Sequence, residues 1–228
     1  MANSDLIARG VKMMDPASVF VDEKAIVADG AVLYPGVILE GACIIGEGAK
    51  IGPNTHLVDT VVKKNARVRQ SVAEGAVVGE ETEVGPFAYL RPGTVVGNKC
   101  RIGNFVEIKN AVLGDETKMA HLAYIGDADV GKGVNYSCGA ITANYDGSKK
   151  HRTVIKDGAF IGSNVNLVAP VTIGEGAFAA AGSTITNDLP DNSLGIARAR
   201  QTEKPEWRNR NAKEKNKSAA SGGSESAG

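Results

Sequence analysis

The chain has 228 residues, of which 43% are hydrophobic and only 5% aromatic, with 28 glycines. This composition argues against a core built around large rings. The formal net charge is zero, so bulk charge indicates no polyanionic partner such as a nucleic acid. The sequence shows neither an apolar stretch long enough to span a bilayer nor a signal peptide, and its three scattered cysteines fit neither a disulfide framework nor a zinc site. We therefore expect a cytoplasmic protein.

We interpret residues 1–18 as a lead-in or linker segment. Apolar residues from Asp5 to Met14 have a loose helical spacing, which Asp15-Pro16 ends. From Val21 a strict period of six begins, in which an aliphatic residue recurs in three long runs. The runs are Val21, Val27, Leu33, Leu39, Ile45, Ile51 and Leu57; Val72, Val78, Val84, Leu90, Val96, Ile102 and Ile108; and Ile155, Ile161, Leu167, Ile173, Ala179 and Ile185.

A period of six fits neither an α-helix nor an alternating strand, but it fits a short strand followed by a corner. Three places after the aliphatic residue stands a glycine or asparagine, as a corner with positive φ requires. These corner residues are Gly30, Gly36, Gly48, Asn54, Asn65, Gly75, Gly93, Gly133, Gly158 and Gly176. Three corners close a triangular coil, and stacked coils pair as a parallel sheet. We predict an all-β, single-stranded parallel β-helix of about nine coils over residues 19–190 rather than a β-sandwich.

The period is interrupted at informative places. It shortens by one residue between Ile108 and Leu113, and again between Ile125 and Val130. It stops after Thr142, so we predict an insertion loop over residues 143–154, and such a loop in a regular solenoid is usually functional. Residues 191–210 are an irregular C-terminal segment. Residues 211–228 are charged and then rich in Ser, Gly and Ala, and we expect them to be disordered.

Two cationic residues on the ladder are not needed for the fold. Arg91 and Lys109 each follow an aliphatic position and lie eighteen residues apart, so we expect them to stack on neighbouring coils. Two cations at that spacing repel each other by about 1 kcal/mol in water. This favours an anion-binding site over two solvated surface charges.

His121 is the candidate general base. Its spacing places it in one column with Asn104 and Cys138, and Tyr124 in the same way lies above Glu107. Cys138 could carry an acyl group covalently. Its glycine-rich surroundings also fit close backbone approach to a ligand, and we favour a thiol without a catalytic role.

No metal site is expected, because His56, His121 and His151 lie too far apart along the solenoid to converge. Cations of the insertion and of the C-terminal segment lack interleaved aromatic residues, which disfavours nucleic-acid binding. They suit a polyphosphate such as the nucleotide of coenzyme A. They are Lys149, Lys150 and Arg152, followed by Arg198, Arg200 and Lys204.

Motifs beyond the six-residue period resemble a specific family. They are R-P-G-T with Arg91, G-N-F-V-E-I-K ending at Lys109, H-L-A-Y-I-G-D-A, N-Y-D-G and G-S-N-V-N-L-V-A-P-V-T-I-G. From about Val11 to Trp207 the chain resembles the C-terminal acetyltransferase domain of the bacterial bifunctional N-acetylglucosamine-1-phosphate uridyltransferase/glucosamine-1-phosphate acetyltransferase. The resemblance implies a left-handed coil, against the usual right-handed crossover, and a homotrimer with active sites between subunits.

The resemblance also implies the reaction and the roles of individual residues. Acetyl-CoA would acetylate the amine of glucosamine 1-phosphate, for UDP-N-acetylglucosamine and cell-wall synthesis, without a metal. His121 would be the base, and the sugar phosphate would be bound by Arg91, Lys109, Tyr124 and Asn135. Acetyl-CoA would contact Cys138, Asn144, Tyr145, Ser163, Ala181 and, in residues 191–210, Arg198, together with Lys150, whose charge suits the nucleotide.

The chain departs from the family pattern in two places. The family's N-terminal nucleotidyltransferase domain has no counterpart, so we expect no uridylyl transfer by this chain. Y-S-C-G-A at 136–140 stands where the family often has smaller residues. Two other functions stay open: a hexapeptide acyltransferase for another amino sugar, amine or acyl group, and a β-helix scaffold without catalysis.

Overall fold

The computed structural model describes residues 3–208. The chain divides into a solenoid unit, Met1–Arg198, and a second unit, Ala199–Gly228. In the described part of the second unit, the Lys204 ammonium lies 5.3 Å from the centroid of the Trp207 ring. The predicted disordered tail, residues 211–228, lies outside the described residues.

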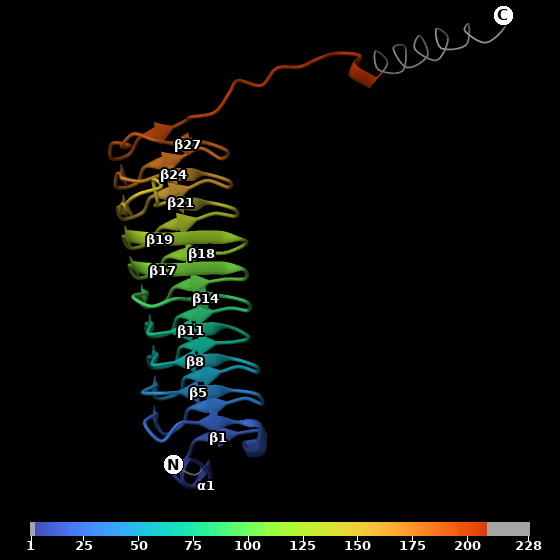
Figure 1. Ribbon diagram of the computed structural model, residues 1–228, viewed down its shortest axis with the longest axis vertical. Helices are drawn as coiled ribbons and strands as arrows, with labels where there is room; N and C mark the ends of the chain where they lie inside the picture. The colour runs from blue at the N-terminus through green and yellow to red at the C-terminus, as the bar shows by residue number, and fades with distance from the viewer. Residues whose placement is uncertain (1–2, 209–228) are drawn as a thin grey trace, which may run out of the picture. The chain divides into compact units, whose positions relative to one another are not determined.

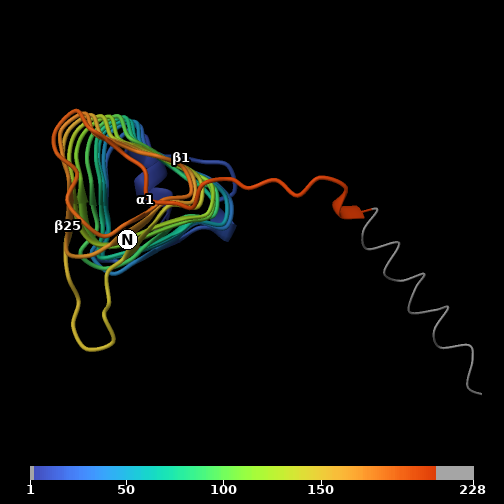
Figure 2. The same cartoon turned by 90° about the horizontal axis from the view of Figure 1, so that it is seen from above.

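The solenoid unit is a parallel β-helix with a triangular cross-section (Figures 1 and 2), and its coil is left-handed, as the resemblance implied. Eleven strands stack on one of its faces within the described residues, so there are about ten coils rather than nine. The difference arises because strands at Lys12–Met13 and Leu194–Gly195 extend the stack at both ends.

Strands of the three faces alternate along the chain (Figure 1). The first face contains β1 (Lys12–Met13), β4 (Val32–Leu33), β7 (Lys50–Ile51), β10 (Arg67–Val68), β13 (Glu83–Val84), β16 (Arg101–Ile102), β18 (Lys118–Met119), β20 (Asn135–Tyr136), β23 (Phe160–Ile161), β26 (Phe178–Ala179) and β28 (Leu194–Gly195). The second face contains β2 (Phe20–Val21), β5 (Ile38–Glu40), β8 (His56–Val58), β11 (Val72–Glu74), β14 (Tyr89–Leu90), β21 (Ile141–Ala143), β24 (Asn166–Val168) and β27 (Thr184–Ile185). The third face contains β3 (Ile26–Val27), β6 (Ile44–Ile45), β9 (Val61–Val62), β12 (Val77–Val78), β15 (Val95–Val96), β22 (Thr153–Ile155) and β25 (Val171–Ile173).

Two longer strands, β17 (Val106–Leu113) and β19 (Ala123–Val130), continue from the second face onto the third. They contain the two places where the sequence period shortens by one residue. In each, the residue at the bend has a positive φ, 46° at Asn110 and 49° at Asp127. The shorter period therefore makes a tighter corner with an unbroken strand.

The ladder residues fill the interior, as the period predicted, although Val21 at the N-terminal end is only half-buried, and one assignment needs correction. Val72 was assigned to the ladder, but Ala73 is the buried residue and Val72 is only half-buried. The reason is register, because Ala73 pairs with the inward-facing Leu57 and Leu90. All ten predicted corner residues have φ between 52° and 79°, which confirms the corners.

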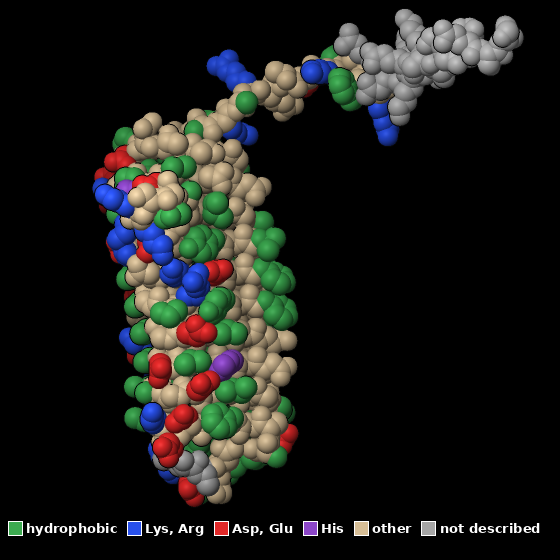
Figure 3. Space-filling view, viewed as in Figure 1, with side chains coloured by type: hydrophobic (Ala, Val, Ile, Leu, Met, Phe, Trp, Pro, Cys, Tyr) green, Lys and Arg blue, Asp and Glu red, His purple; other side chains and the backbone are tan. Residues whose placement is uncertain are grey.

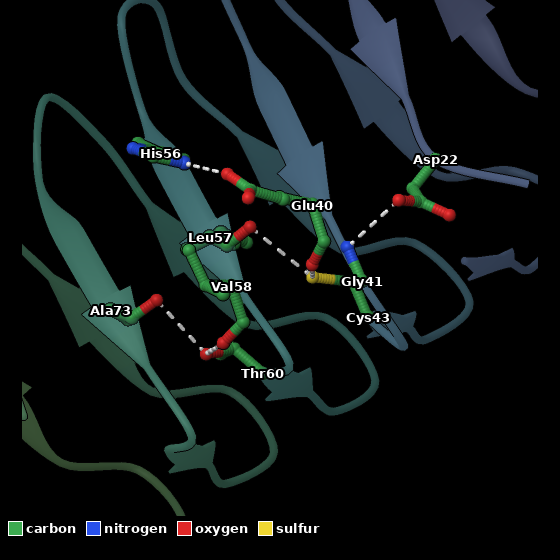
Figure 4. Close-up of polar contacts among 9 residues, drawn as sticks. All are labelled: Asp22, Glu40, Gly41, Cys43, His56, Leu57, Val58, Thr60 and Ala73. Carbon is green, nitrogen blue, oxygen red and sulfur yellow. Dashed lines mark hydrogen bonds and ion pairs between the residues drawn. The ribbon is translucent and has the colours of Figure 1, made fainter. Parts of the chain in front are cut away.

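Small polar residues beside the ladder connect one coil to the next (Figure 4). The Cys43 thiol donates to the Leu57 carbonyl at 3.4 Å, and the Thr60 hydroxyl donates to the Ala73 carbonyl at 3.1 Å. Because these groups are buried, the bonds satisfy polar atoms that would otherwise destabilise the core. They supplement the strand-to-strand hydrogen bonds.

The ends of the solenoid and its insertion complete the fold. The short helix α1 (Asn3–Ala8) buries Leu6 against the first coil, and the 3-10 turn η1 (Pro16–Ser18) follows β1. The insertion extends beyond the triangular outline as the yellow loop in Figure 2. Its irregular part is residues 144–152, shorter than the predicted 143–154, because Ala143 ends β21 and Thr153 begins β22. It leaves the solenoid at the corner between the second and third faces, where Asn144 follows β21.

Candidate functional site

His121 lies at the corner between the first and second faces. Its backbone N–H donates to the Asn104 carbonyl, and its own carbonyl accepts from Gly139 beside Cys138, both at 3.0 Å. This confirms the column of Asn104, His121 and Cys138. His121 and the following Leu122 both have positive φ, 64° and 57°, and the imidazole is exposed. No side chain in residues 3–208 hydrogen-bonds that ring, so both nitrogens are free to bind a ligand.

A hollow of about 390 Å³ opens beside this corner on the first face. Four residues proposed from the sequence line it: His121, Asn135, Cys138 and Ser163. The Asn135 amide donates to the Ser137 hydroxyl at 3.0 Å, which holds the amide in place. We call this the His121 hollow; its other lining residues are Arg101, Lys118, Met119, Ala120, Tyr136 and Ser137.

Arg101 and Lys118 were not identified as site residues from the sequence. They pair with each other across β16 and β18, and Lys118 pairs with Asn135. All three therefore occupy the same outward position on successive coils. The period would have revealed this had it been applied to the outward positions as well as to the aliphatic ones.

A cationic cluster lies on the second face. The Arg91 backbone donates to the Ile108 carbonyl at 2.8 Å, which places Arg91 and Lys109 on neighbouring coils, as predicted. The Lys150 side chain lies against that of Lys109, and this contact and its charge lower the pKa of Lys109. Lys150, assigned to the coenzyme from the sequence, thus lies with the residues assigned to the phosphate. Figure 3 shows Lys and Arg side chains gathered near mid-height of the solenoid.

One acid lies within this cluster. The Arg91 guanidinium donates to the Glu107 carboxylate at 2.9 Å, with both side chains partly exposed. Tyr124 pairs with Glu107 across β17 and β19, which confirms their predicted stacking. A side chain in place of Gly126 would collide with the Tyr124 hydroxyl and with the Asn144 amide. Gly126 therefore gives Tyr124 room to lean toward the insertion.

Asp127 is a buried carboxylate that the sequence reasoning missed. Its exposed fraction is 6%, and it accepts hydrogen bonds from the Asn110 and Asn144 amides. Burial tends to raise the pKa of Asp127, but these two bonds and the charges of Lys150 and Lys109 outweigh it and lower the pKa. Because Asn144 donates its amide N–H to Asp127, its amide oxygen is left for another partner.

The insertion is held by its own polar contacts. Asp146 accepts from the backbone N–H groups of Ser148 and Lys149 at 2.7 and 2.6 Å, and pairs with His151 at 2.7 Å. These bonds lower the pKa of Asp146 to about 2. At its base, Arg152 binds Asp129 through two hydrogen bonds of 2.8 and 2.5 Å. This network positions Lys150, while Tyr145 stays exposed.

The remaining proposed coenzyme residues continue up the His121 corner. Ser163 and Ala181 occupy that corner on later coils, since the Gly182 N–H donates to the Ser163 carbonyl at 2.8 Å. Arg198 approaches the same corner, because a Cβ at Gly182 would lie 3.9 Å from its Cδ. The His121 hollow and the cationic cluster thus lie on two adjoining faces, with the His121 corner between them.

The three histidines have separate surroundings. His56 pairs with Glu40 at 3.1 Å, as Figure 4 shows, and His151 pairs with Asp146, whereas His121 lies at the hollow. Within residues 3–208, no three His, Cys, Asp or Glu side chains form a group that could hold a metal. No helix in the same range is long and apolar enough to cross a membrane.

Residues 75–110 and 152–187 match the family model described as bacterial transferase hexapeptide (six repeats). The UDP-N-acetylglucosamine acyltransferase of Francisella novicida, a solved structure, aligns with 79% of this chain and 66% of its own length, with a TM-score of 0.56 and 19% identity. At that identity the likeness shows a shared fold alone.

Two bacterial proteins are much closer in sequence. The chain is 52% identical over 89% of its length to the bifunctional protein GlmU of Carboxydothermus hydrogenoformans, and 48% identical over 91% to the bifunctional protein GlmU of Geobacillus sp.. These alignments confirm the resemblance inferred from the motifs. The chain spans 45% of the length of either relative.

Proposed function

We propose that this protein transfers the acetyl group of acetyl-CoA to the amine of glucosamine 1-phosphate. The observation that carries the proposal is the cationic cluster of Arg91, Lys109 and Lys150 on the face next to His121. A phosphate monoester would relieve the repulsion between Lys109 and Lys150. The similarity to bifunctional GlmU proteins supports the same reaction.

In the proposed mechanism the cluster binds the phosphate and so orients the sugar. Arg91 is held by Glu107, and Tyr124 and Asn135 complete the sugar site. His121 accepts a proton from the substrate ammonium, and the free amine then attacks the thioester carbonyl.

The tetrahedral intermediate would be stabilised by a backbone N–H or the Ser163 hydroxyl. As it collapses, the C–N bond is complete and the C–S bond breaks. The attacking nitrogen loses its extra proton and the departing sulfur gains one, so the coenzyme leaves as a thiol, and His121 returns to solvent the proton taken from the ammonium. Acetyl-CoA would lie along the corner formed by Cys138, Ser163 and Ala181, reaching Arg198. Asn144 and Tyr145 would contact it from the insertion corner.

We further propose that the active protein is a cytoplasmic homotrimer with sites between subunits, which serves UDP-N-acetylglucosamine and cell-wall synthesis. Asn135 and the cationic cluster belong to different faces of one chain. A small ligand that contacted both would have to bend around the His121 corner. If a second copy of the chain supplied either Asn135 or the cationic cluster, the ligand would not have to bend around the corner.

The test is release of thiol from acetyl-CoA with glucosamine 1-phosphate as acceptor, compared with glucosamine and glucosamine 6-phosphate, without added metal. Release with the 1-phosphate alone supports both substrate and reaction. Release with none of them, despite coenzyme binding, means another acceptor. If the protein neither releases thiol nor binds the coenzyme, the alternative of a β-helix scaffold without catalysis is supported.

A further inference from the structure

The first face carries another hollow, several coils closer to the N-terminus. It has a volume of about 300 Å³ and lies over β7, β10 and β13. We call it the Lys50 hollow; its lining residues are Tyr34, Lys50, Gly52, Pro53, Arg67, Val68, Arg69, Glu83 and Val84. None of them belongs to the site described above.

The six-residue period gives the two hollows the same framework. The outward residues Lys50, Arg67 and Glu83 pair in register, and the same column continues through Arg101 and Lys118 into the His121 hollow. Each hollow is thus formed by three successive strands of one face and the corner that follows them. They are repeat-related sites with different side chains.

The Lys50 hollow and the His121 hollow differ chemically in their corner residue. Pro53 stands three residues after Lys50, as His121 stands three residues after Lys118. A proline at this place has no group that can accept a proton from a substrate. The Lys50 hollow therefore has the shape for binding but lacks the base of the His121 hollow.

Its charges favour an anion. Arg67 pairs with Glu83 at 3.7 Å, and both side chains are more than half exposed, so the pair is weak. Lys50 and Arg69 are exposed and have no acidic partner among residues 3–208. A Cβ at Gly52 would lie 2.6 Å from the Arg69 Cβ, so this glycine leaves room for Arg69 on the next coil.

The hollow also has an aromatic wall. Tyr34 is half-buried and lines it, and a tyrosine ring can stack on a planar base. Unpaired cations beside such a ring fit a ligand with phosphates and a base better than a simple anion. We propose that the Lys50 hollow is a non-catalytic nucleotide site that binds the phosphates through Lys50 and Arg69 and the base against Tyr34.

Equilibrium dialysis of ADP against the full chain tests this proposal. Coenzyme A is left out, because it carries an ADP group and would compete for the same hollow. Binding of ADP at the Lys50 hollow is expected to weaken at least about tenfold in Lys50→Gln/Arg69→Gln, since two charge-assisted bonds are lost. Lys12→Gln/Lys24→Gln removes the same charge outside the hollow and is expected to leave binding unchanged. Acetyl transfer without ADP should also be unchanged in Lys50→Gln/Arg69→Gln.

A second variant distinguishes binding of the base from binding of the phosphates. It also tests the proposal if the double variant does not fold. Tyr34→Leu is expected to weaken ADP binding several-fold while leaving inorganic pyrophosphate binding unaltered. The proposal is overturned if Lys118→Gln weakens ADP binding as much as the double variant does, or if both double variants weaken it equally. These outcomes do not depend on whether glucosamine 1-phosphate is the acceptor.

Discussion

The side chains of Lys109 and Lys150 lie against each other, and this contact lowers the pKa of Lys109. Lys109 belongs to β17, whereas Lys150 is carried by the insertion. Two ammonium groups do not attract each other, so the arrangement depends on the scaffold that holds each of them and on the nearby carboxylate of Asp127. An anion bound between them would make it favourable.

The affinity for glucosamine 1-phosphate is expected to decrease as pH rises through the lowered pKa of free Lys109. A bound phosphate stabilises the protonated amine and raises that pKa. Affinity is therefore greatest below the free-state pKa and is lost between the free and bound values. Calorimetry in buffers of different ionisation enthalpy should show proton uptake at alkaline pH.

The matched variant for this experiment is Lys150→Gln. It removes the repulsion, so the decrease in affinity should move to higher pH, while affinity at neutral pH falls through loss of one cation. An affinity that does not change across the alkaline range in the wild type would contradict the role given to the pair.

His121→Gln is expected to lower kcat by about 10²- to 10⁴-fold, because it removes the proton acceptor. The KM for acetyl-CoA should change little, since the corner and its coenzyme contacts remain. His56→Gln is the control, because His56 is half-buried, pairs with Glu40 and lies outside the site. Equal losses in both variants, measured by thiol release, would remove His121 from the mechanism.

Asp127→Asn is expected to lower the free energy of unfolding by about 1–3 kcal/mol. The new amide cannot accept from both Asn110 and Asn144 as the carboxylate does. Asn144 should also reorient, which raises the KM for acetyl-CoA. Urea denaturation and steady-state kinetics measure the two effects, and Asp29→Asn, an exposed carboxylate on the first coils, serves as the control. An unchanged free energy of unfolding would show that the two hydrogen bonds to Asp127 do not stabilise the fold.

The order of the insertion is expected to be insensitive to pH until strongly acidic conditions. The folded-state pKa of Asp146 is about 2, below its ordinary value of 3.8. The stabilisation of the insertion by ionised Asp146 is therefore fully present above pH 3.8 and is lost as pH falls toward 2. Amide exchange of residues 143–154, corrected for the intrinsic rate, should rise in that window. Asp146→Asn should show high exchange at every pH.

Much of the fold could be predicted because a period of six is a local property. Each repeat specifies its own inward aliphatic residue and its own corner, so the same pattern predicts strands, corners and stacking. The columns of His121 with Asn104 and of Arg91 with Lys109 followed from counting along the chain. The count failed at Val72, where a shortened corner moved Ala73 into the interior.

The sequence by itself determined the all-β solenoid, its coil-to-coil register over most of its length, and the neighbours in each column, because these depend on residues a fixed step apart. Only the tertiary structure decided which side chains from different columns, or from the insertion, come into contact. The insertion interrupts the period, so its folding alone brings Lys150 to Lys109. Asn110 and Asn144 each lie 17 residues from Asp127 and both donate to it, but Asn110 at the equivalent corner is exposed, so only the structure shows that the Asp127 carboxylate is buried.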